Sequence, residues 1–232
     1  MNPTTTVLGL DPNFVPYQEA WDLQKQTHEA VANHSQSPVI YLLEHAAVYT
    51  AGKRTEEHDR PTDGTPVVDV DRGGLLTWHG PGQLVGYPII ELADKAAIRP
   101  YVETLEEALI NVIAEYGIKG ERVKGRSGVW IVGDGLTPDR KIAAIGIRVD
   151  HGVTMHGFAL NCSNDLDPYS IIIPCGITDA GVTTMSLEAG RTITPSDVVD
   201  RVEEELVKLL TPLMKDESAV AAEASQTEGI SA

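Results

Sequence analysis

Hydrophobic positions along the chain follow a helical spacing in some segments and a strand-like spacing in others. Residues 17–33 form the first helical segment, in which apolar or small side chains recur on one face, at Tyr17, Ala20, Trp21 and Val31. The continuously apolar run at 39–45 directly follows Pro38 and predicts a buried strand. The polar, turn-rich stretch 51–66 predicts a loop.

Two later segments have the clearest helical pattern. The first begins at Pro100 and ends at Gly117, and proline and glycine are favoured at these two ends of a helix. The second begins at 194–197, where Thr-Pro-Ser-Asp resembles an N-cap followed by proline in the first turn. Each helix has a continuous apolar face, with Val102, Leu105, Leu109, Val112, Ile113 and Tyr116 in the first and Val198, Val199, Val202, Leu206, Leu209 and Leu210 in the second.

Between these helices the pattern is strand-like. Residues 129–132 and 141–149 read as strands separated by a polar turn, and the tripeptide at 150–152 predicts a hairpin into a further strand at 153–163. We find no internal repeat and no second linker, so we expect one α/β domain over residues 1–214. Residues 215–232 are small, polar and acidic, and we expect this tail to be disordered.

Composition narrows the class of protein. The 232 residues are 42% hydrophobic, which is enough for a substantial core. No apolar run approaches the roughly 20 residues that span a bilayer, and the N-terminus lacks the pattern of a secretion signal. Two cysteines, Cys162 and Cys175, make a disulfide framework an unlikely scaffold for this chain. We therefore expect a cytoplasmic protein that does not bind membranes.

The formal net charge of −16 argues against a surface for nucleic acid. One segment departs from this balance, because residues 119–148 contain seven basic and three acidic side chains, a local excess of +4. Two interpretations stay open at this point. The segment is either an ordinary solvated face or a basic patch that attracts acidic partners.

The most unusual stretch is RGGLLTWHGPGQLVGYPI at 72–89. Its glycines and prolines disfavour a helix and are typical of a loop whose backbone lies close against a ligand. Ordinary turn chemistry would use the same glycines. The stretch lacks the Gly-Lys-Ser/Thr of a phosphate loop and the G-x-G-x-x-G spacing of a dinucleotide site.

Two side chains are candidates for covalent chemistry. Cys162 lies inside an apolar strand and reads as a small buried hydrophobe, whereas Cys175 lies between proline and glycine in a predicted loop and is a candidate nucleophile. Lys141 begins an apolar strand, where a lysine often only extends its ammonium to solvent. If Lys141 lay beside Cys175, its charge would favour the reactive thiolate, and burial would lower its pKa enough for proton transfer. Spacing does not show whether the two residues meet.

Histidine and cysteine spacing gives no metal site. The chain contains neither a His-x-x-x-His pair nor a Cys-x-x-Cys motif. His151 falls in the predicted hairpin turn. We therefore predict no metal.

Five segments, in this order, resemble the lipoyl(octanoyl) transferases, a family in the wider group of lipoate- and biotin-protein ligase catalytic domains. They are RGGLLTWHGPGQLVGYPI at 72–89, GVWI at 128–131, RKIAAIGIRV at 140–149, HGFALN at 156–161 and PCGI at 174–177. The resemblance covers most of residues 5–213. Trp78 stands where many relatives have tyrosine, and we expect the aromatic wall to be kept.

The resemblance implies a fold and an activity. The fold is a single α/β domain with a larger mixed sheet and a smaller sheet flanked by helices. The activity is transfer of an octanoyl or lipoyl group from acyl carrier protein to a lysine of a lipoyl domain, the first step of protein lipoylation from endogenous octanoate. Acceptors would be the lipoyl domains of 2-oxoacid dehydrogenase complexes and the glycine cleavage H protein. Cys175 would carry the acyl group as a thioester and Lys141 would move the protons, without ATP or any other cofactor.

The resemblance also implies an acyl pocket. Its lining would be Arg72, Gly73, Gly74, Leu75, Leu76, Thr77, Trp78, His79, Ala144, Ile145, Gly146, Gly157, Phe158 and Ala159. We expect Leu76, Ile145 and Phe158 to supply apolar wall and the small residues to keep the channel open. His79 either faces the substrate or only shapes its loop. The oxyanion would be held by backbone N–H groups near Cys175 or by polar groups of 72–79.

Two rival functions remain. An ATP-dependent lipoate- or biotin-protein ligase of the same fold would activate a free acid and need no cysteine. A non-catalytic member would only bind lipoyl domains. Loss of activity in Cys175→Ser would separate the transferase from the ligase, because only the transferase forms an acyl-enzyme.

Overall fold

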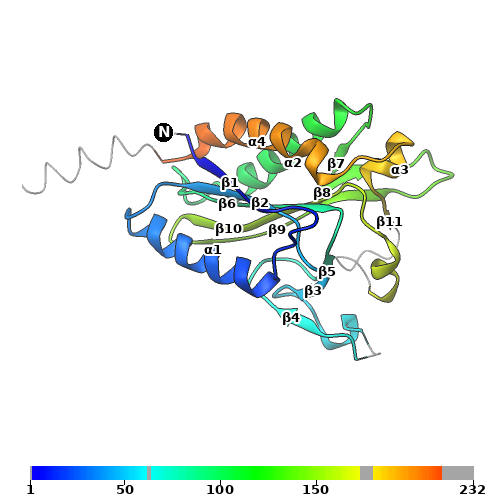
Figure 1. Ribbon diagram of the computed structural model, residues 1–232. Coiled ribbons are helices and arrows are strands. Elements are labelled where there is room, and N and C mark those ends of the chain that lie inside the picture. Colours follow the sequence, from blue (N-terminus) through cyan, green and yellow to red (C-terminus); the bar gives the residue numbers. More distant parts are fainter. Residues whose placement is uncertain (1, 62–63, 173–179, 216–232) are drawn as a thin grey trace, which may run out of the picture.

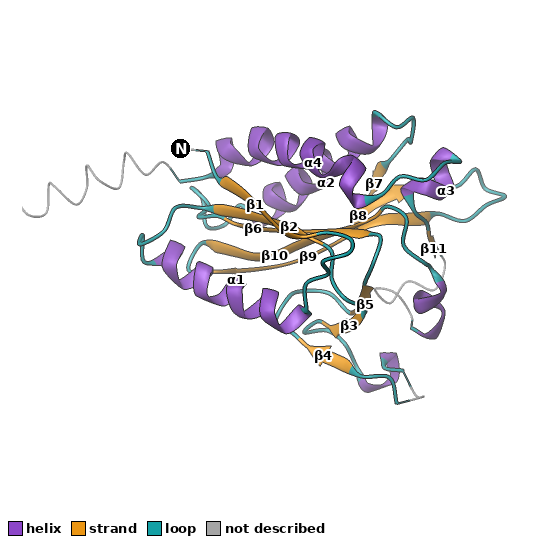
Figure 2. Cartoon of the chain, viewed as in Figure 1, coloured by secondary structure: helices purple, strands orange, loops and turns teal. Residues whose placement is uncertain are grey.

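The computed structural model describes residues 2–61, 64–172 and 180–215 (Figure 1). The chain contains both helices and strands (Figure 2). In order they are β1 (Thr4–Gly9), α1 (Tyr17–Ala32), β2 (Val39–Leu43), β3 (Val48–Ala51), η1 (Glu57–Asp59), β4 (Val67–Asp69), β5 (Leu76–His79), β6 (Gln83–Ile89), α2 (Ile98–Ala114), β7 (Glu121–Val123), β8 (Arg126–Ile131), β9 (Arg140–Asp150), β10 (Val153–Asn161), η2 (Asp167–Ile171), β11 (Gly181–Val182), α3 (Met185–Ala189), α4 (Pro195–Leu210) and η4 (Thr211–Leu213).

Two sheets organise the domain. Within the described residues, eight strands form the larger sheet in the order β1-β2-β6-β10-β9-β8-β7, with β11 paired to β9, and β4-β3-β5 form the smaller sheet. Parallel β1–β2 and β9–β11 pairs make the larger sheet mixed. Helices α2 and α4 cover one of its faces and α1 the other (Figure 1). The predicted α/β fold with a larger mixed sheet, a smaller sheet and flanking helices is confirmed.

Side-chain alternation along β2 divides the interior into two cores. Ile40 and Leu42 pack toward α2 and α4, while Tyr41 and Leu43 pack toward α1. All five residues of β2 are buried, as the continuously apolar run predicts. The smaller sheet lies on the α1 side, where Tyr17 at the start of α1 stacks on the last residue of β5. The space between the two sheets is therefore bounded by α1.

The two helices with the strongest sequence patterns lie where the patterns predict them. The first is α2, and the second is α4, which Thr194 caps in a reciprocal capping box with Asp197. The predicted hairpin joins β9 to β10. None of the helices in the described part of the chain combines the length and apolar character of a membrane span. Of the tail expected at 215–232, only Lys215 belongs to the described residues.

The stretch 72–89 differs from the predicted loop. Only 72–75 is a loop, because the rest forms β5, a Gly-Pro-Gly turn and β6. Strand β6 lies in the middle of the larger sheet, where pairing with β2 and β10 outweighs the weak strand propensity of its glycine and proline. Gly86 also has a packing role, since a Cβ there would lie 2.2 Å from the ring of Phe158. Tertiary pairing thus decides the structure of this segment.

Candidate active site

A cavity of about 230 Å³ lies between the two sheets. Its walls come from β9 and β10 of the larger sheet, β5 and the 72–75 loop, the turn between β7 and β8, and the first residue of α1. The predicted site residues that line it are Arg72, Gly74, Leu75, Thr77, His79, Lys141, Ala144, Ile145, Gly146, Gly157, Phe158 and Ala159. Three segments that are separate in the sequence, 72–89, 140–149 and 156–161, therefore meet at one cavity.

Three predicted pocket residues lie elsewhere. Side chains alternate along β5, so Thr77 and His79 face the cavity while Leu76 and Trp78 pack into the small core against Tyr169. The apolar wall expected from Leu76 is therefore absent from this cavity. Gly73 lies at its edge, where its N–H donates to the carbonyl of β9 residue 147 at 2.9 Å. Cys175 lies outside the described residues.

The cavity also has lining residues that the sequence reasoning missed. They are Tyr17, Arg54, Tyr87, Gly125, Arg126, Ser127 and His156. Tyr17 reads in the sequence as part of the apolar face of a helix, and nothing in the helical pattern separates it from a core residue. His156 begins the segment HGFALN and Tyr87 lies near the end of the glycine-rich stretch. A polar or aromatic residue within such a motif was the available signal.

His79 forms part of the buried floor of the cavity. Its Nδ1 lies 2.8 Å from Gln83 Oε1, and the Gln83 amide nitrogen donates to Asn161 Oδ1 and to the Tyr169 hydroxyl, each at 2.9 Å. Because the Gln83 nitrogen is the donor, its oxygen accepts from Nδ1–H, which leaves Nε2 of His79 as an acceptor. Burial, together with the nearby His45, lowers the pKa of His79 to about 3. His79 is therefore neutral.

His45 and two tyrosines complete this floor. His45 Nδ1 donates to the carbonyl of Val15 at 2.8 Å, so its Nε2 accepts from the Tyr87 hydroxyl at 2.7 Å. Burial lowers the pKa of His45 to about 4, and burial raises the pKa of Tyr17 to about 12. Tyr17 stacks on His79 with ring centroids 6.1 Å apart. The aromatic floor is hydrogen-bonded within itself and carries no charge near neutral pH.

The guanidinium of Arg72 fixes the glycine loop above the cavity. This buried side chain donates to the carbonyls of Gly73 and Leu75 at 3.0 and 2.9 Å. It also donates to the carbonyl and hydroxyl of Thr50 in β3, at 2.8 and 2.9 Å. The loop is therefore tied both to itself and to the smaller sheet, which explains an arginine at this position without any ligand.

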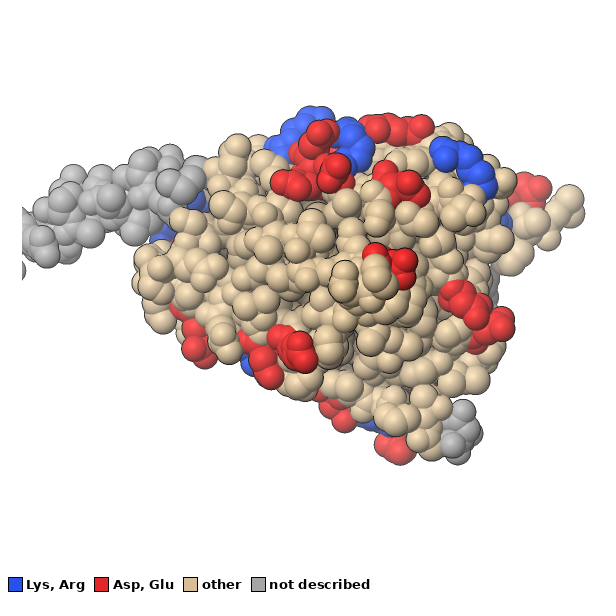
Figure 3. All heavy atoms as spheres, viewed as in Figure 1, with Lys and Arg blue, Asp and Glu red and all other residues tan. Residues whose placement is uncertain are grey.

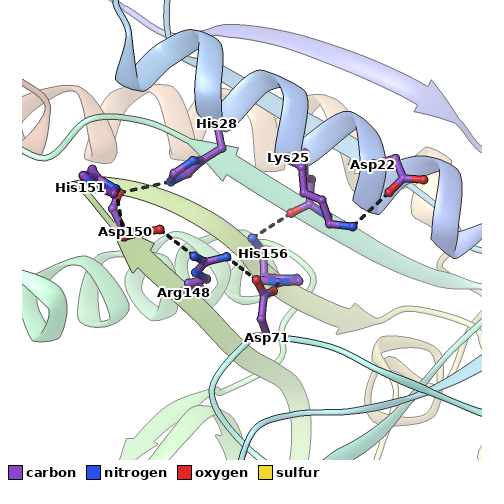
Figure 4. Close-up of polar contacts among 9 residues, drawn as sticks. Asp22, Lys25, His28, Asp71, Arg148, Asp150, His151 and His156 are labelled. Carbon is purple, nitrogen blue, oxygen red and sulfur yellow. Dashed lines mark hydrogen bonds and ion pairs between the residues drawn. The ribbon is translucent and has the colours of Figure 1, made fainter.

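Asp71 anchors the same loop to the larger sheet (Figure 4). His156 Nε2 lies 2.8 Å from the Asp71 carboxylate, which also pairs with Arg148, and Arg148 reaches Asp150 at 2.6 Å. The hydrogen bond from His156 is the largest cause of a strongly lowered pKa at Asp71. His156 adopts a φ of 57°, and its backbone N–H donates to the Gln24 side chain of α1 at 2.8 Å. With this left-handed backbone conformation, His156 directs its ring toward the cavity floor and toward Asp71, which anchors the loop.

Lys141 lies at the other end of the cavity. It is 8% exposed and its Nζ lies 4.7 Å from the ring centroid of Trp130 on β8. Among the described residues, Lys141 forms no ion pair with a carboxylate. It also lines a second cavity of about 280 Å³, whose other walls include Tyr169, Ala180 and Val182. Val182 pairs directly with Lys141 in the parallel β11–β9 ladder.

Within residues 2–61, 64–172 and 180–215, no three His, Cys, Asp or Glu side chains are grouped to hold a metal ion. Cys162 is fully buried on β10's C-terminal side, where burial strongly raises the pKa of its thiol. It is therefore an inert thiol, as expected from its apolar surroundings.

Solved structures of low sequence identity share this fold. The bipartite lipoate protein ligase of Thermoplasma acidophilum superposes with a TM-score of 0.68 at 15% identity, covering 91% of this chain and 84% of that chain. A lipoate-protein ligase A bound with ATP superposes with a TM-score of 0.58 at 16% identity, covering 92% and 85%. The chain thus has the α/β fold of these two lipoate protein ligases.

Sequence similarity identifies the family. Residues 16–207 match the family model of the lipoyl protein ligase A/B catalytic domain. The chain is 64% identical over 203 residues to the octanoyltransferase of Arthrobacter sp. (strain FB24), covering 88% of this chain and 91% of that relative. It is 66% identical over 193 residues to the octanoyltransferase of Renibacterium salmoninarum, covering 83% of each. The chain therefore belongs to the lipoyl protein ligase A/B catalytic domain family, and it is a transferase.

Proposed function

We propose that this enzyme transfers an octanoyl group from acyl carrier protein to a lysine of a lipoyl domain through a thioester on Cys175. The observation that carries the proposal is the high identity to octanoyltransferases over most of both chains. The buried Lys141 at the edge of the inter-sheet cavity supports it. The relevant acceptors would be the lipoyl domains of 2-oxoacid dehydrogenase complexes and the glycine cleavage H protein.

In the first step the Cys175 thiol gives its proton to the side-chain amine of Lys141. The thiolate attacks the thioester carbonyl of the donor, and the carbon–sulfur bond to the phosphopantetheine arm breaks. The departing thiolate takes the proton back from Lys141. One thioester replaces another, so the step needs neither ATP nor a metal. Trp130, against which Lys141 packs, limits the positions that its amine can reach.

In the second step the amine of the acceptor lysine attacks the carbonyl of the acyl-enzyme. An ammonium has no lone pair, so the acceptor lysine first loses one proton to solvent and attacks as the free amine. Lys141 then accepts the proton that the nitrogen loses as the amide forms and delivers it to the departing Cys175 sulfur. The products are an amide and the free thiol. Ala180, five residues after Cys175 in the sequence, lines a cavity together with Lys141, which supports pairing of these two residues in one reaction.

The inter-sheet cavity would hold the octanoyl chain. One of its walls consists of small residues on two adjacent strands, Ala144 and Gly146 on β9 and Gly157 and Ala159 on β10. Burial of seven methylene-sized groups contributes roughly 5 kcal/mol at about 0.8 kcal/mol each. A Cβ at Gly157 would lie 2.2 Å from the carbonyl oxygen of Gly86, so strand packing alone already requires glycine there.

Intact-mass measurement after mixing the enzyme with octanoyl-acyl carrier protein tests the proposal. We expect a mass gain of one octanoyl group that Cys175→Ala abolishes. Cys162→Ala is the matched control, because this thiol is fully buried and should leave acylation intact. Transfer that proceeds from free octanoate only with ATP, and survives Cys175→Ser, would instead identify a ligase. Binding of lipoyl domains with no acyl transfer would identify the non-catalytic alternative.

A further inference from the structure

Two basic turns border the inter-sheet cavity, and we call their exposed side the mouth. One carries Lys53 and Arg54, whose backbone N–H groups donate to the carbonyls of Arg72 and Gly74 at 3.0 and 3.1 Å. The other is the β7–β8 turn, with Lys124 at its tip and Arg126 beside it. Arg54 and Arg126 line the cavity itself. Lys53, Arg54 and Lys124 are exposed.

Basic side chains elsewhere are largely neutralised by carboxylates. Arg122, in the basic 119–148 segment, lies 3.2 Å from Glu106 and 2.5 Å from Glu107. Its charge is therefore already paired with carboxylates. In the same segment Lys119, Arg140 and Arg148 also pair with carboxylates. On the face drawn in Figure 3, the largest basic group lies directly against acidic side chains along the upper edge. The sequence excess of +4 is therefore not a uniform basic patch.

The cavity mouth is different. Within the described ranges, Lys53, Arg54 and Lys124 have no carboxylate at ion-pair distance. Among the described residues these three charges lack an ion-pair partner, in a chain whose formal net charge is −16. Charges at the rim of a binding surface change mainly the rate of association and its salt dependence. An anionic partner that approached this otherwise acidic protein would therefore be favoured at the mouth.

We propose that Lys53, Arg54 and Lys124 form the docking surface for the acidic face of the carrier protein that donates the acyl chain. This inference rests on the proposed function. The donor must dock over the mouth, because its acyl chain enters the cavity there. The acceptor presents a lysine ammonium to the same mouth, which the cations there repel. The positive rim therefore suits the donor better than the acceptor.

Charge reversal with rapid-mixing kinetics tests this surface. We compare Lys53→Glu and Lys124→Glu with Lys95→Glu, an exposed lysine beside Gly152 in the β9–β10 turn that serves as the matched control. The second-order rate of acylation by octanoyl-carrier protein should fall roughly tenfold at low ionic strength in each mouth variant. The loss should shrink at high ionic strength, because salt screens exposed charges. Lys95→Glu should change the rate less than about twofold.

Three further measurements separate the explanations. Octanoyl-pantetheine and octanoyl-phosphopantetheine serve as small donors, and the ratio of carrier to small-donor rates should fall in both mouth variants. An equal loss with octanoyl-phosphopantetheine would assign the cations to the phosphate and overturn docking of the protein face. A loss confined to transfer onto the lipoyl domain would assign them to the acceptor.

If the wild type accepts octanoyl from none of these donors, the proposed function fails instead. Lys53→Gln and Lys124→Gln should give smaller losses of the same kind, which excludes misfolding as the cause.

Discussion

A side chain at position 146 should change which acyl chains the enzyme accepts. Gly146 lines the cavity on β9, opposite Gly157 on β10. A Cβ at Gly146 would lie 3.1 Å from Cδ of Arg72 and 3.2 Å from the carbonyl oxygen of Gly73. The loop on that side is held by the hydrogen bonds of Arg72, so it yields little. The added side chain therefore takes its volume from the cavity.

The size of the effect follows from the methylenes that are displaced. Valine adds three carbon atoms, and we take the space of two methylenes as lost to an octanoyl chain. At about 0.8 kcal/mol per methylene this costs about 1.6 kcal/mol of binding. The corresponding ratio is roughly 15-fold, at about 1.4 kcal/mol per factor of ten. A hexanoyl chain would end before the obstruction and keep its affinity.

Acylation rates with hexanoyl and octanoyl donors measure this discrimination directly. For Gly146→Val, we expect the ratio of octanoyl to hexanoyl kcat/KM to fall roughly 15-fold, and for Gly146→Ala less, because alanine adds one carbon. Thermal unfolding of both variants checks that the domain remains folded. An equal loss of activity for both chain lengths would refute the assignment of this cavity to the acyl chain.

Further predictions concern stability. Asp71→Asn removes the negative charge that pairs with Arg148 and strengthens the hydrogen bond from His156, and it should lower the free energy of unfolding by about 2 kcal/mol in urea titrations. Asp22→Asn, which breaks only an exposed pair, should cost less than about 0.5 kcal/mol, and equal effects would contradict the anchoring role. Burial lowers the pKa of His45 to about 4 and of His79 to about 3 in the folded protein. The unfolded chain, with a histidine pKa of about 6.5, binds more protons below that pH. Stability should therefore fall as pH decreases from about 6.5 toward 4, and denaturation curves that coincide at pH 7 and pH 5 would contradict neutral burial. Gly157→Ala should prevent soluble folding, because its Cβ would lie 2.2 Å from a carbonyl of β6.

The elements that the sequence predicts correctly are those whose pattern is visible within a short window of the chain. Helix α4 has a capping box and a one-sided apolar face, and β2 has an uninterrupted apolar run, so short windows contain the necessary information. Strand β6 contains Gly86 and Pro88, which local propensity rejects, and it is a strand because its two neighbours pair with it. Pairing between residues far apart in the sequence does not appear in any short window.

The candidate site shows the same contrast between what a local motif predicts and what only the fold decides. Motif resemblance identified Lys141 and the small residues of β9 and β10, and these residues line the cavity. It also grouped Leu76 with Thr77, because a contiguous motif does not show which way each side chain of a strand points. The structure separates them by alternation along β5. Tyr17 comes from a helix about sixty residues away, and only the fold brings it to His79.

The distribution of charge within the site agrees with the two demands of the proposed reaction. An acyl chain needs a surface that pays no desolvation penalty when water leaves. The floor meets much of this demand because His79, which lines the cavity, is neutral and bonds to Gln83, and His45 beside it is neutral and bonds to Tyr87. An acidic carrier needs the opposite, and cations lie at the mouth. If the same cations lay on the floor, they would have to lose water as the chain entered, at a cost that its methylenes could not offset. A neutral aromatic floor and cations at the rim therefore suit a cavity that binds an apolar acyl chain delivered by an anionic protein.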